Sequence, residues 1–186
     1  STKELVWTPS ANANGDLSAF SVKAIDGSGV PSSGTVPATI RVAPVSDLPV
    51  LTTITTFSNG SEDTDFIIRH AAVAGNADES DADNIGAIDF KVVGGITGTM
   101  GVRTLNAVTA PTPVVGTVIL TALNELVWRP ATNANGVLTA CTMVAHTSDG
   151  DSATPVELKV QVTPVNDLVV VTSAILPVQY SLNING

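Results

Sequence analysis

The chain has 186 residues and a formal net charge of −9, because 17 Asp and Glu residues face only eight Lys and Arg. This acidic balance argues against nucleic acid or an anionic membrane surface as a partner, and it makes divalent cations the natural counterions. Hydrophobic residues form 44% of the sequence and aromatic residues only 4%, so small and β-branched side chains must build the core. Such a composition suits short strands packed as a sandwich.

The single cysteine, Cys141, excludes an intramolecular disulfide, so stability must come from packing or from a bound metal. Its place in an alternating segment predicts a small buried side chain and not a reactive thiol. Pro, Thr, Ser or a charged residue interrupts every apolar stretch before the roughly 18 residues that a membrane span requires. No signal peptide is visible, so a secreted protein would carry its targeting signal outside this sequence.

Residues 1–47 predict three antiparallel strands. The first is expected at residues 5–7, ahead of a tight turn at Asn14-Gly15, where both residues tolerate positive φ. Apolar and polar residues then alternate over residues 20–24 and again over residues 36–42, the pattern of strands with one buried face.

Residues 48–167 predict about seven short strands. The apolar alternation has a period of two, and no segment sustains the 3.6-residue period of a helix beyond one turn at residues 71–74. The expected strands lie at residues 50–57, 66–68, 87–93, around 102–105, 114–120, 125–128, 138–145 and 156–162. A β-sandwich with Greek-key connections accommodates this set.

Two stretches of the chain occur twice. Glu4-Leu5-Val6-Trp7 returns as Glu125-Leu126-Val127-Trp128, and each copy leads through a Pro to Asn-Ala-Asn-Gly. Pro44-Val45-Ser46-Asp47 returns as Pro164-Val165-Asn166-Asp167. The spacings are 121 residues (125 minus 4) and 120 residues (164 minus 44), which is the length of a domain and not of a solenoid repeat.

This period divides the chain into unequal parts. Residues 1–47 match the C-terminal part of one repeat, residues 48–167 form a complete repeat, and residues 168–186 supply either the opening strand of a following repeat or a donated strand. This division is explained best if the chain is a section of a longer tandem array. The alternative is a natural subunit whose ends are complementary.

The order of strand, Pro, Asn-rich turn, strand, Asp-Gly, strand and Pro-Val-Asn-Asp resembles bacterial cadherin-like or VCBS-type tandem repeats of large secreted adhesins. Glu62-Asp63-Thr64 and Ser80-Asp81-Ala82-Asp83 resemble two further motifs of these repeats, although Asn84-Ile85 stands where Gly-Asp is usual and Ser46 replaces Asn. The resemblance implies all-β, Ig-like or cadherin-like sandwiches in tandem. It also implies a structural extender module, or stalk, at the cell surface or in the extracellular space.

The resemblance further implies bound calcium, which takes six to eight oxygen ligands and suits acidic loops at one end of a sandwich. Carried over position by position, the candidate ligands are Asp47, Glu62, Asp63, Asp81, Asp83, Asn166 and Asp167, with Asp149 and Asp151 as weaker additions. The alternative is that these side chains are solvated loop charges.

No other motif predicts chemistry. His70 and His146 are isolated in the sequence, so zinc is not expected. No sequence motif brings a nucleophile together with a base, so we expect no enzyme activity. Trp7 and Trp128 occupy the same place in each copy, which favours a packing role over a platform for sugars.

Three functions follow in order of preference. The first is the calcium-stiffened stalk, whose partners are neighbouring repeats of the same polypeptide. The second is a subunit of an extracellular filament, with identical chains joined head-to-tail by strand donation. The third is a carbohydrate-binding module.

Overall fold

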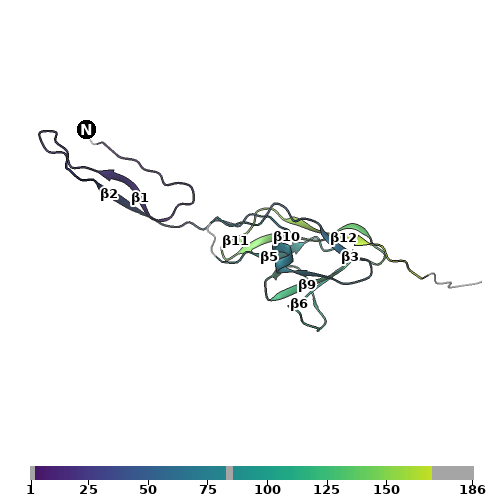
Figure 1. Cartoon of the computed structure of the whole chain (residues 1–186). Coiled ribbons are helices and arrows are strands. Elements are labelled where there is room, and N and C mark those ends of the chain that lie inside the picture. The colour runs from purple at the N-terminus through teal and green to yellow at the C-terminus, as the bar shows by residue number, and fades with distance from the viewer. Residues whose placement is uncertain (1–2, 83–85, 169–186) are drawn as a thin grey trace, which may run out of the picture.

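The computed structural model describes residues 3–82 and 86–168, and these residues are nearly all β (Figure 1). The one helix among them, α1 (His70–Ala74), has five residues, and no described helix is long and apolar enough to cross a membrane. The strands are β1 (Gly15–Val22), β2 (Val36–Val42), β3 (Phe57–Ser61), β4 (Phe66–Arg69), β5 (Asp89–Gly94), β6 (Thr99–Thr104), β7 (Thr112–Pro113), β8 (Val118–Leu120), β9 (Asn124–Arg129), β10 (Gly136–Thr147), β11 (Gly150–Asp151) and β12 (Val156–Thr163).

Residues 48–168 form two sheets that pack face to face. One sheet has the order β3-β12-β10-β5-β8, with β11 paired to β10, and the other has the order β4-β9-β6-β7. Strand β3 runs parallel to β12, and every other pairing in these sheets is antiparallel. Three of the ten strands, β7, β8 and β11, have three residues or fewer, and the other seven have four or more.

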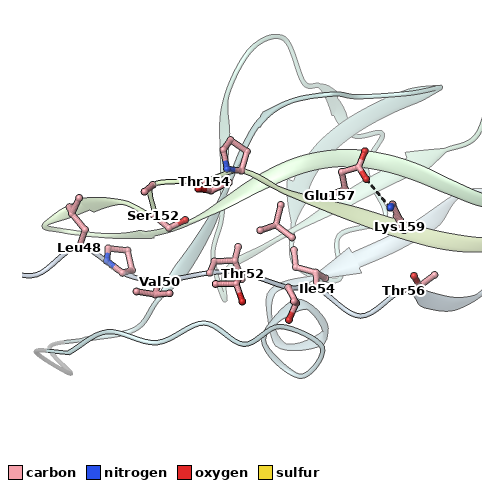
Figure 2. A pocket seen from close by; sticks show the side chains of 15 residues that line it. Leu48, Val50, Thr52, Ile54, Thr56, Ser152, Thr154, Glu157 and Lys159 are labelled. Carbon is pink, nitrogen blue, oxygen red and sulfur yellow. Dashed lines mark ion pairs between the residues drawn. The ribbon is translucent and has the colours of Figure 1, made fainter.

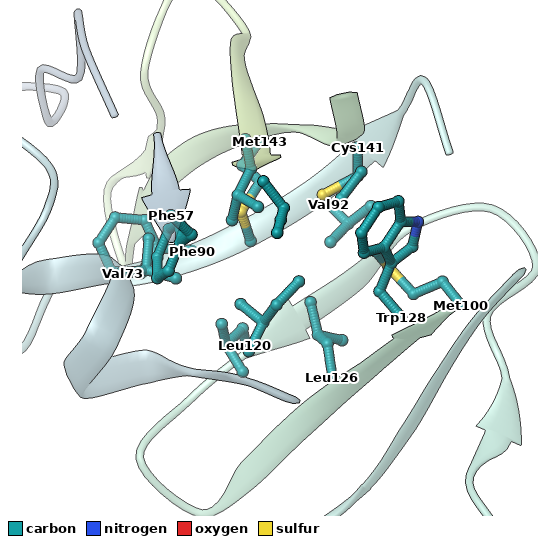
Figure 3. Close-up of a cluster of buried hydrophobic side chains, with 14 of the residues drawn as sticks. Phe57, Val73, Phe90, Val92, Met100, Leu120, Leu126, Trp128, Cys141 and Met143 are labelled. Carbon is teal, nitrogen blue, oxygen red and sulfur yellow. The ribbon is translucent and has the colours of Figure 1, made fainter. Parts of the chain in front are cut away.

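The core lies between the two sheets, where alternate side chains of facing strands meet (Figure 3). Trp128 on β9 is fully buried, and its Nε1 donates a hydrogen bond to the carbonyl oxygen of Thr97 over 2.6 Å. Its predicted packing role is therefore confirmed. Cys141 is also buried, as predicted, and burial raises the pKa of its thiol to about 12, so the thiol is inert at neutral pH.

Residues 50–56, here called the crossing segment, run beside residues 77–80 before the chain joins the first sheet at Phe57. Val50 and Ile54 make isolated bridges to Ser80 and Ala77, and regular pairing to β12 begins only at Phe57. The predicted strand at residues 50–57 is therefore placed wrongly, because β3 starts where that strand was expected to end. Gly60 permits the late pairing, since a Cβ at this position would lie 2.8 Å from Cγ1 of Val160.

Asp78 holds the crossing segment in place. Its carboxylate accepts hydrogen bonds from the Thr52 hydroxyl and from the backbone N–H groups of Thr53 and Thr52, the latter two over 2.8 Å and 2.9 Å. The bond from the Thr52 hydroxyl and the two backbone bonds hold the pKa of Asp78 far below its usual range. The segment before β3 is thus fixed by a side chain and not by a β-ladder.

The repeated sequence forms the same hairpin twice. Strand β1 pairs with β2 as β10 pairs with β12, and the pairing slips by one residue at Ala19 and at Ala140, which are 121 residues apart. The turn before each hairpin also matches, because Asn12 has a φ of 60° and Asn133 a φ of 59°. The equivalent pairs are Gly15 with Val42 and Gly136 with Val162, Leu17 with Ile40 and Leu138 with Val160, and Val22 with Val36 and Met143 with Val156.

Residues 5–7 do not form the predicted strand, so residues 3–47 contain two strands and not three. Their equivalents, residues 126–128 on β9, pair with β4 on one side and β6 on the other. No described strand offers residues 5–7 such partners, and Leu5 and Val6 remain 72% and 85% exposed. The same sequence therefore needs tertiary neighbours to become a strand.

The other predicted elements lie close to their observed positions. Strand β2 has the predicted limits, β12 extends one residue further, and α1 covers the predicted helical turn. Strand β1 begins at Gly15, before the predicted residues 20–24, because pairing starts directly after the Asn-rich turn. The segment predicted at residues 114–120 is a strand only from Val118 onward.

Glu125 forms a buried ionic clamp across the second sheet. Its side chain is fully buried on β9, and Arg103 on β6 and Arg69 on β4 donate to its two carboxylate oxygens over 2.8 Å and 3.0 Å. Burial raises the pKa of Glu125, but the hydrogen bonds from Arg103 and Arg69 outweigh it and keep the pKa below its usual value. The clamp joins three strands, while the equivalent Glu4 is exposed.

We expect Trp128→Ala to reduce the free energy of unfolding by about 3–5 kcal/mol, the usual cost of removing a buried indole. The matched variant is Trp7→Ala, because Trp7 occupies the same place in the first copy but is only partly buried. Chemical denaturation followed by circular dichroism measures both. An equal loss from the two variants would show that residues 3–47 have a core as complete as that of the domain.

We expect Glu125→Gln to destabilise the domain by about 2–3 kcal/mol at pH 7, because two charged hydrogen bonds lose their carboxylate acceptor. A carboxylate with a lowered folded-state pKa stabilises above its unfolded pKa. The difference in stability from the parent protein should therefore shrink as the pH falls below 4.5, the pKa of an unperturbed Glu side chain, toward the lower folded-state pKa. Denaturation at several pH values tests this, with Glu4→Gln as the control that should leave stability unchanged.

Candidate functional site

The predicted calcium ligands lie at two opposite ends of the complete domain. Glu62, Asp63, Asn166 and Asp167 lie at the end where the chain leaves β12, and Asp47 and Asp81 lie at the end where the chain enters (Figure 1). Asp83 lies outside the described residues. The structure thus brings together two subsets of the predicted ligands and separates these subsets by the length of the sandwich.

At the exit end, Glu62 is a buried carboxylate with an exposed fraction of 3%. Its Oε1 accepts a hydrogen bond from the backbone N–H of Val165 over 2.5 Å, and its Oε2 accepts one from Nδ2 of Asn135 over 3.2 Å. Its own N–H donates to the carbonyl oxygen of Thr163 over 3.1 Å. Glu62 therefore ties the linker after β12 to the body of the domain.

Asp63 connects the same loop to the Asn-rich turn. Its backbone has a φ of 59°, a conformation that Asp tolerates better than most residues. Its carbonyl oxygen accepts a hydrogen bond from Arg129 over 2.6 Å, and its Oδ1 accepts a longer one from the N–H of Asn133 over 3.4 Å. Asn166 and Asp167 follow in the linker and are exposed, so their oxygen atoms face solvent beside this network.

At the entry end, the first linker contacts the turn between β10 and β11. The hydroxyl of Ser46 donates to Oδ1 of Asp149 over 3.0 Å, and a Cβ at Gly150 would lie only 2.7 Å from Cδ2 of Leu48. Asp47 also lines a hollow of about 210 Å³ with Asn12 and Asn14 of the preceding Asn-rich turn. Asp47 therefore sits between the first hairpin and the complete domain.

The acidic residues of segment 78–81 lie close to the entry end. Ser80 exchanges backbone hydrogen bonds with Val50 over 2.8 Å and 3.0 Å, which places its neighbour Asp81 beside the incoming chain. Within the part of the chain that the structure describes, Oε2 of Glu79 is buried and has no hydrogen-bond partner. A buried carboxylate oxygen without a donor is costly unless a cation or water satisfies it.

Asp151, one of the weaker candidates, is engaged elsewhere. Its Oδ2 lies 2.7 Å from Nζ of Lys91 and its Oδ1 lies 2.6 Å from Nδ1 of His146. The hydrogen bonds from Lys91 and then His146 lower the pKa of Asp151. His70 has a comparable acidic neighbour, Asp89, at 3.4 Å. Both histidines thus have carboxylate neighbours that the linear sequence did not indicate.

Residues 3–82 and 86–168 contain no group of three or more His, Cys, Asp or Glu side chains arranged to hold a metal ion. At the exit end, the possible ligands are Glu62, Asp63 and nearby amide and carbonyl groups. At the entry end, they are Asp47, Asp81 and Glu79. Calcium accepts carbonyl and amide oxygens as well as carboxylates, so both ends have the right class of donor atom.

A third feature, which the sequence did not predict, is an open groove of about 810 Å³ beside β12. Figure 2 shows Leu48, Val50, Thr52 and Ile54 along one wall and Ser152, Thr154 and Glu157 along the other. The groove exists because the crossing segment pairs toward residues 77–80 and leaves the first half of β12. Sequence patterns did not reveal this divergence, since residues 48–56 resemble an ordinary strand.

Comparisons of this chain with protein-family models, with curated proteins and with solved structures find no match.

We expect Glu62→Ala to loosen the linker, because the N–H of Val165 loses its acceptor and the amide of Asn135 loses a partner. The expected loss of stability is about 1–3 kcal/mol in the presence of a chelator. Hydrogen exchange of the Val165 amide, measured by NMR, should accelerate, while the control Asp65→Ala on the same loop should leave it unchanged. Equal protection of Val165 in Glu62→Ala and in the parent would contradict the tether.

Proposed function

We propose that this chain is part of a tandem array of Ig-like, cadherin-like domains that serves as a stalk of a secreted or surface-anchored bacterial adhesin. One observation carries the proposal: β1–β2 and β10–β12 form the same hairpin, with the same register and the same bulge, 120 to 121 residues apart (136 minus 15 and 162 minus 42). Each hairpin is followed by a Pro-Val linker that ends in Asp.

The strand order supports the Ig-like part of the proposal. In an Ig-like sandwich the last two strands pair with each other within one sheet. Here β12 pairs with β10 and in parallel with β3, while the segment before β3 bridges to residues 77–80. Strands β4, β9 and β6 complete the opposite sheet in the order that Greek-key connections produce.

The positions of the two linkers support an extending role. The chain enters the complete domain at one end and leaves β12 at the other, so successive domains would follow one another along a line (Figure 1). Each linker is held by a side-chain contact, from Ser46 to Asp149 at the entry and from Glu62 to Val165 at the exit. Such contacts restrict the angle between neighbouring domains.

Calcium would add to this restriction. We place candidate ions at both ends, with Asp47 and Asp81 at the entry and Glu62, Asp63, Asn166 and Asp167 at the exit; the further candidate Asp83 lies outside the described residues. The orphaned Oε2 of Glu79 supports a cation near the entry, and the net charge of −9 supports counterion binding in general. A carbohydrate-binding role is less supported, because Trp128 is enclosed in the core and offers no face to a sugar.

We expect millimolar calcium to raise the melting temperature, because a ligand that binds only the folded state stabilises it. Extracellular modules bind calcium with dissociation constants of about 10⁻⁴ to 10⁻³ M, so each site should add on the order of 1 kcal/mol. Calorimetry with calcium and with a chelator measures the effect. Scattering at small angles should show a narrower distribution of end-to-end lengths with calcium.

Two double variants separate the ends. Asp81→Asn with Asp83→Asn should remove the entry contribution, and Asp63→Asn with Asp167→Asn the exit contribution. Glu157→Gln is the matched control, since Glu157 pairs with Lys159 on an exposed part of β12. A melting temperature that calcium leaves unchanged would refute the calcium part of the proposal, although the repeated hairpin would remain.

A further inference from the structure

The first half of β12 has an open edge. Strand β10 pairs with β12 from Val156 to Val162, whereas β3 pairs with the other edge only from Val160 to Thr163. Within residues 3–82 and 86–168, no strand pairs with residues 156–159 on that second edge. The backbone groups of a sheet edge form a template for a further strand.

The groove of about 810 Å³ runs along this edge and suits an uncharged, extended segment. Leu51, which is 3% exposed, and the half-buried Val156 line it together with Ile54, while Thr52 and Thr56 add hydroxyl groups. The two charged side chains of the lining, Glu157 and Lys159, pair with each other over 2.8 Å (Figure 2). Because these two charges neutralise each other, the lining does not favour a charged ligand.

We propose that this groove accepts residues 168–176 of a second copy of the chain, as a strand added to the open edge of β12. Residues 168–186 contain no charged residue, and their first part is rich in Val, Ile and Thr, which favour strands. Leu48, Val50 and Thr52, which line the groove, recur at the 120-residue spacing (168 minus 48) as Leu168, Val170 and Thr172. The tail thus repeats the apolar and hydroxyl side chains that line this groove. The residues after 168 lie outside the described part of the chain.

The donor is a second copy because the chain leaves its own domain at the wrong end. Glu62 fixes Val165 at the exit end, while the groove begins at Leu48 near the entry end (Figure 1). Strand β3 occupies the edge of β12 between these places. A tail that enters the groove of its own domain would have to pass around β3, whereas the tail of another molecule meets the open side directly.

The exposed apolar face of the β1–β2 hairpin is a second surface, but one donated strand does not cover it. In the complete domain the equivalent hairpin is flanked by β3 and β5 and packs against β9. Residues 168–176 correspond to the segment before β3 and replace none of these strands. The groove beside β12, in contrast, has room that one added strand would fill.

The test uses the full chain in the presence of a chelator, so its outcome is independent of calcium. Sedimentation equilibrium measures association over a range of concentrations. We expect concentration-dependent oligomers, and a synthetic peptide of residues 167–178 should dissociate them. Val170→Pro should weaken association about tenfold or more, because Pro removes a backbone donor from the added strand.

Val50→Lys places a charge in the groove, and its matched control is Val137→Lys on the same sheet. Val50 is 52% exposed and Val137 is 57% exposed, so both variants should fold, and Thr154→Lys is a second groove variant. We expect the groove variants to weaken association about tenfold or more and Val137→Lys to leave it unchanged. A monomeric chain that does not bind the peptide would overturn the proposal. So would oligomers that Val50→Lys and Thr154→Lys leave intact, since these would arise at another surface such as the β1–β2 hairpin.

Discussion

The pairing of β10 with β12 is the constraint on which the rest of the domain depends. It places one edge of β10 against β5 and one edge of β12 against β3, so the first sheet grows outward from this hairpin. The same hairpin forms from residues 15–42 without β3, β5 or β9 beside it. Its register therefore arises from its own sequence, through alternating apolar residues and the bulge after the fourth pair.

The course of the chain before β3 determines which surface features the domain exposes beside β12. Asp78 holds Thr52 and Thr53 on one side, and Gly60 permits close approach to β12 on the other. Between these two points the chain bridges to residues 77–80 and not to β12. The groove and the open edge of β12 are the geometric result, and one strand of suitable sequence would fill them.

Much of the fold could be predicted from period-two alternation, because β5, β10 and β12 pack one face against the core and β2 follows the same alternation with its apolar face exposed. The strand at residues 5–7 could not be excluded in this way, since its sequence equals that of β9 and only the neighbours differ. Strand β3 was missed for the opposite reason, because Asn59 and Gly60 indicate a turn. Here a glycine with little intrinsic strand preference is required by the closeness of Val160.

The candidate ligands show the same limit. Their residue types were readable from sequence, but their division between two ends depends on which strands connect the loops, and a linear pattern does not contain that distance. The Asp-rich loop follows α1 and the Pro-Val-Asn-Asp linker follows β12, so they lie at opposite ends of the sandwich. Any ion bound at one end must then draw its remaining oxygen ligands from the adjoining linker or the neighbouring domain. In the proposed array, stiffness would then be a property of each junction, and a domain studied without its neighbours would bind calcium more weakly than the same domain within the array.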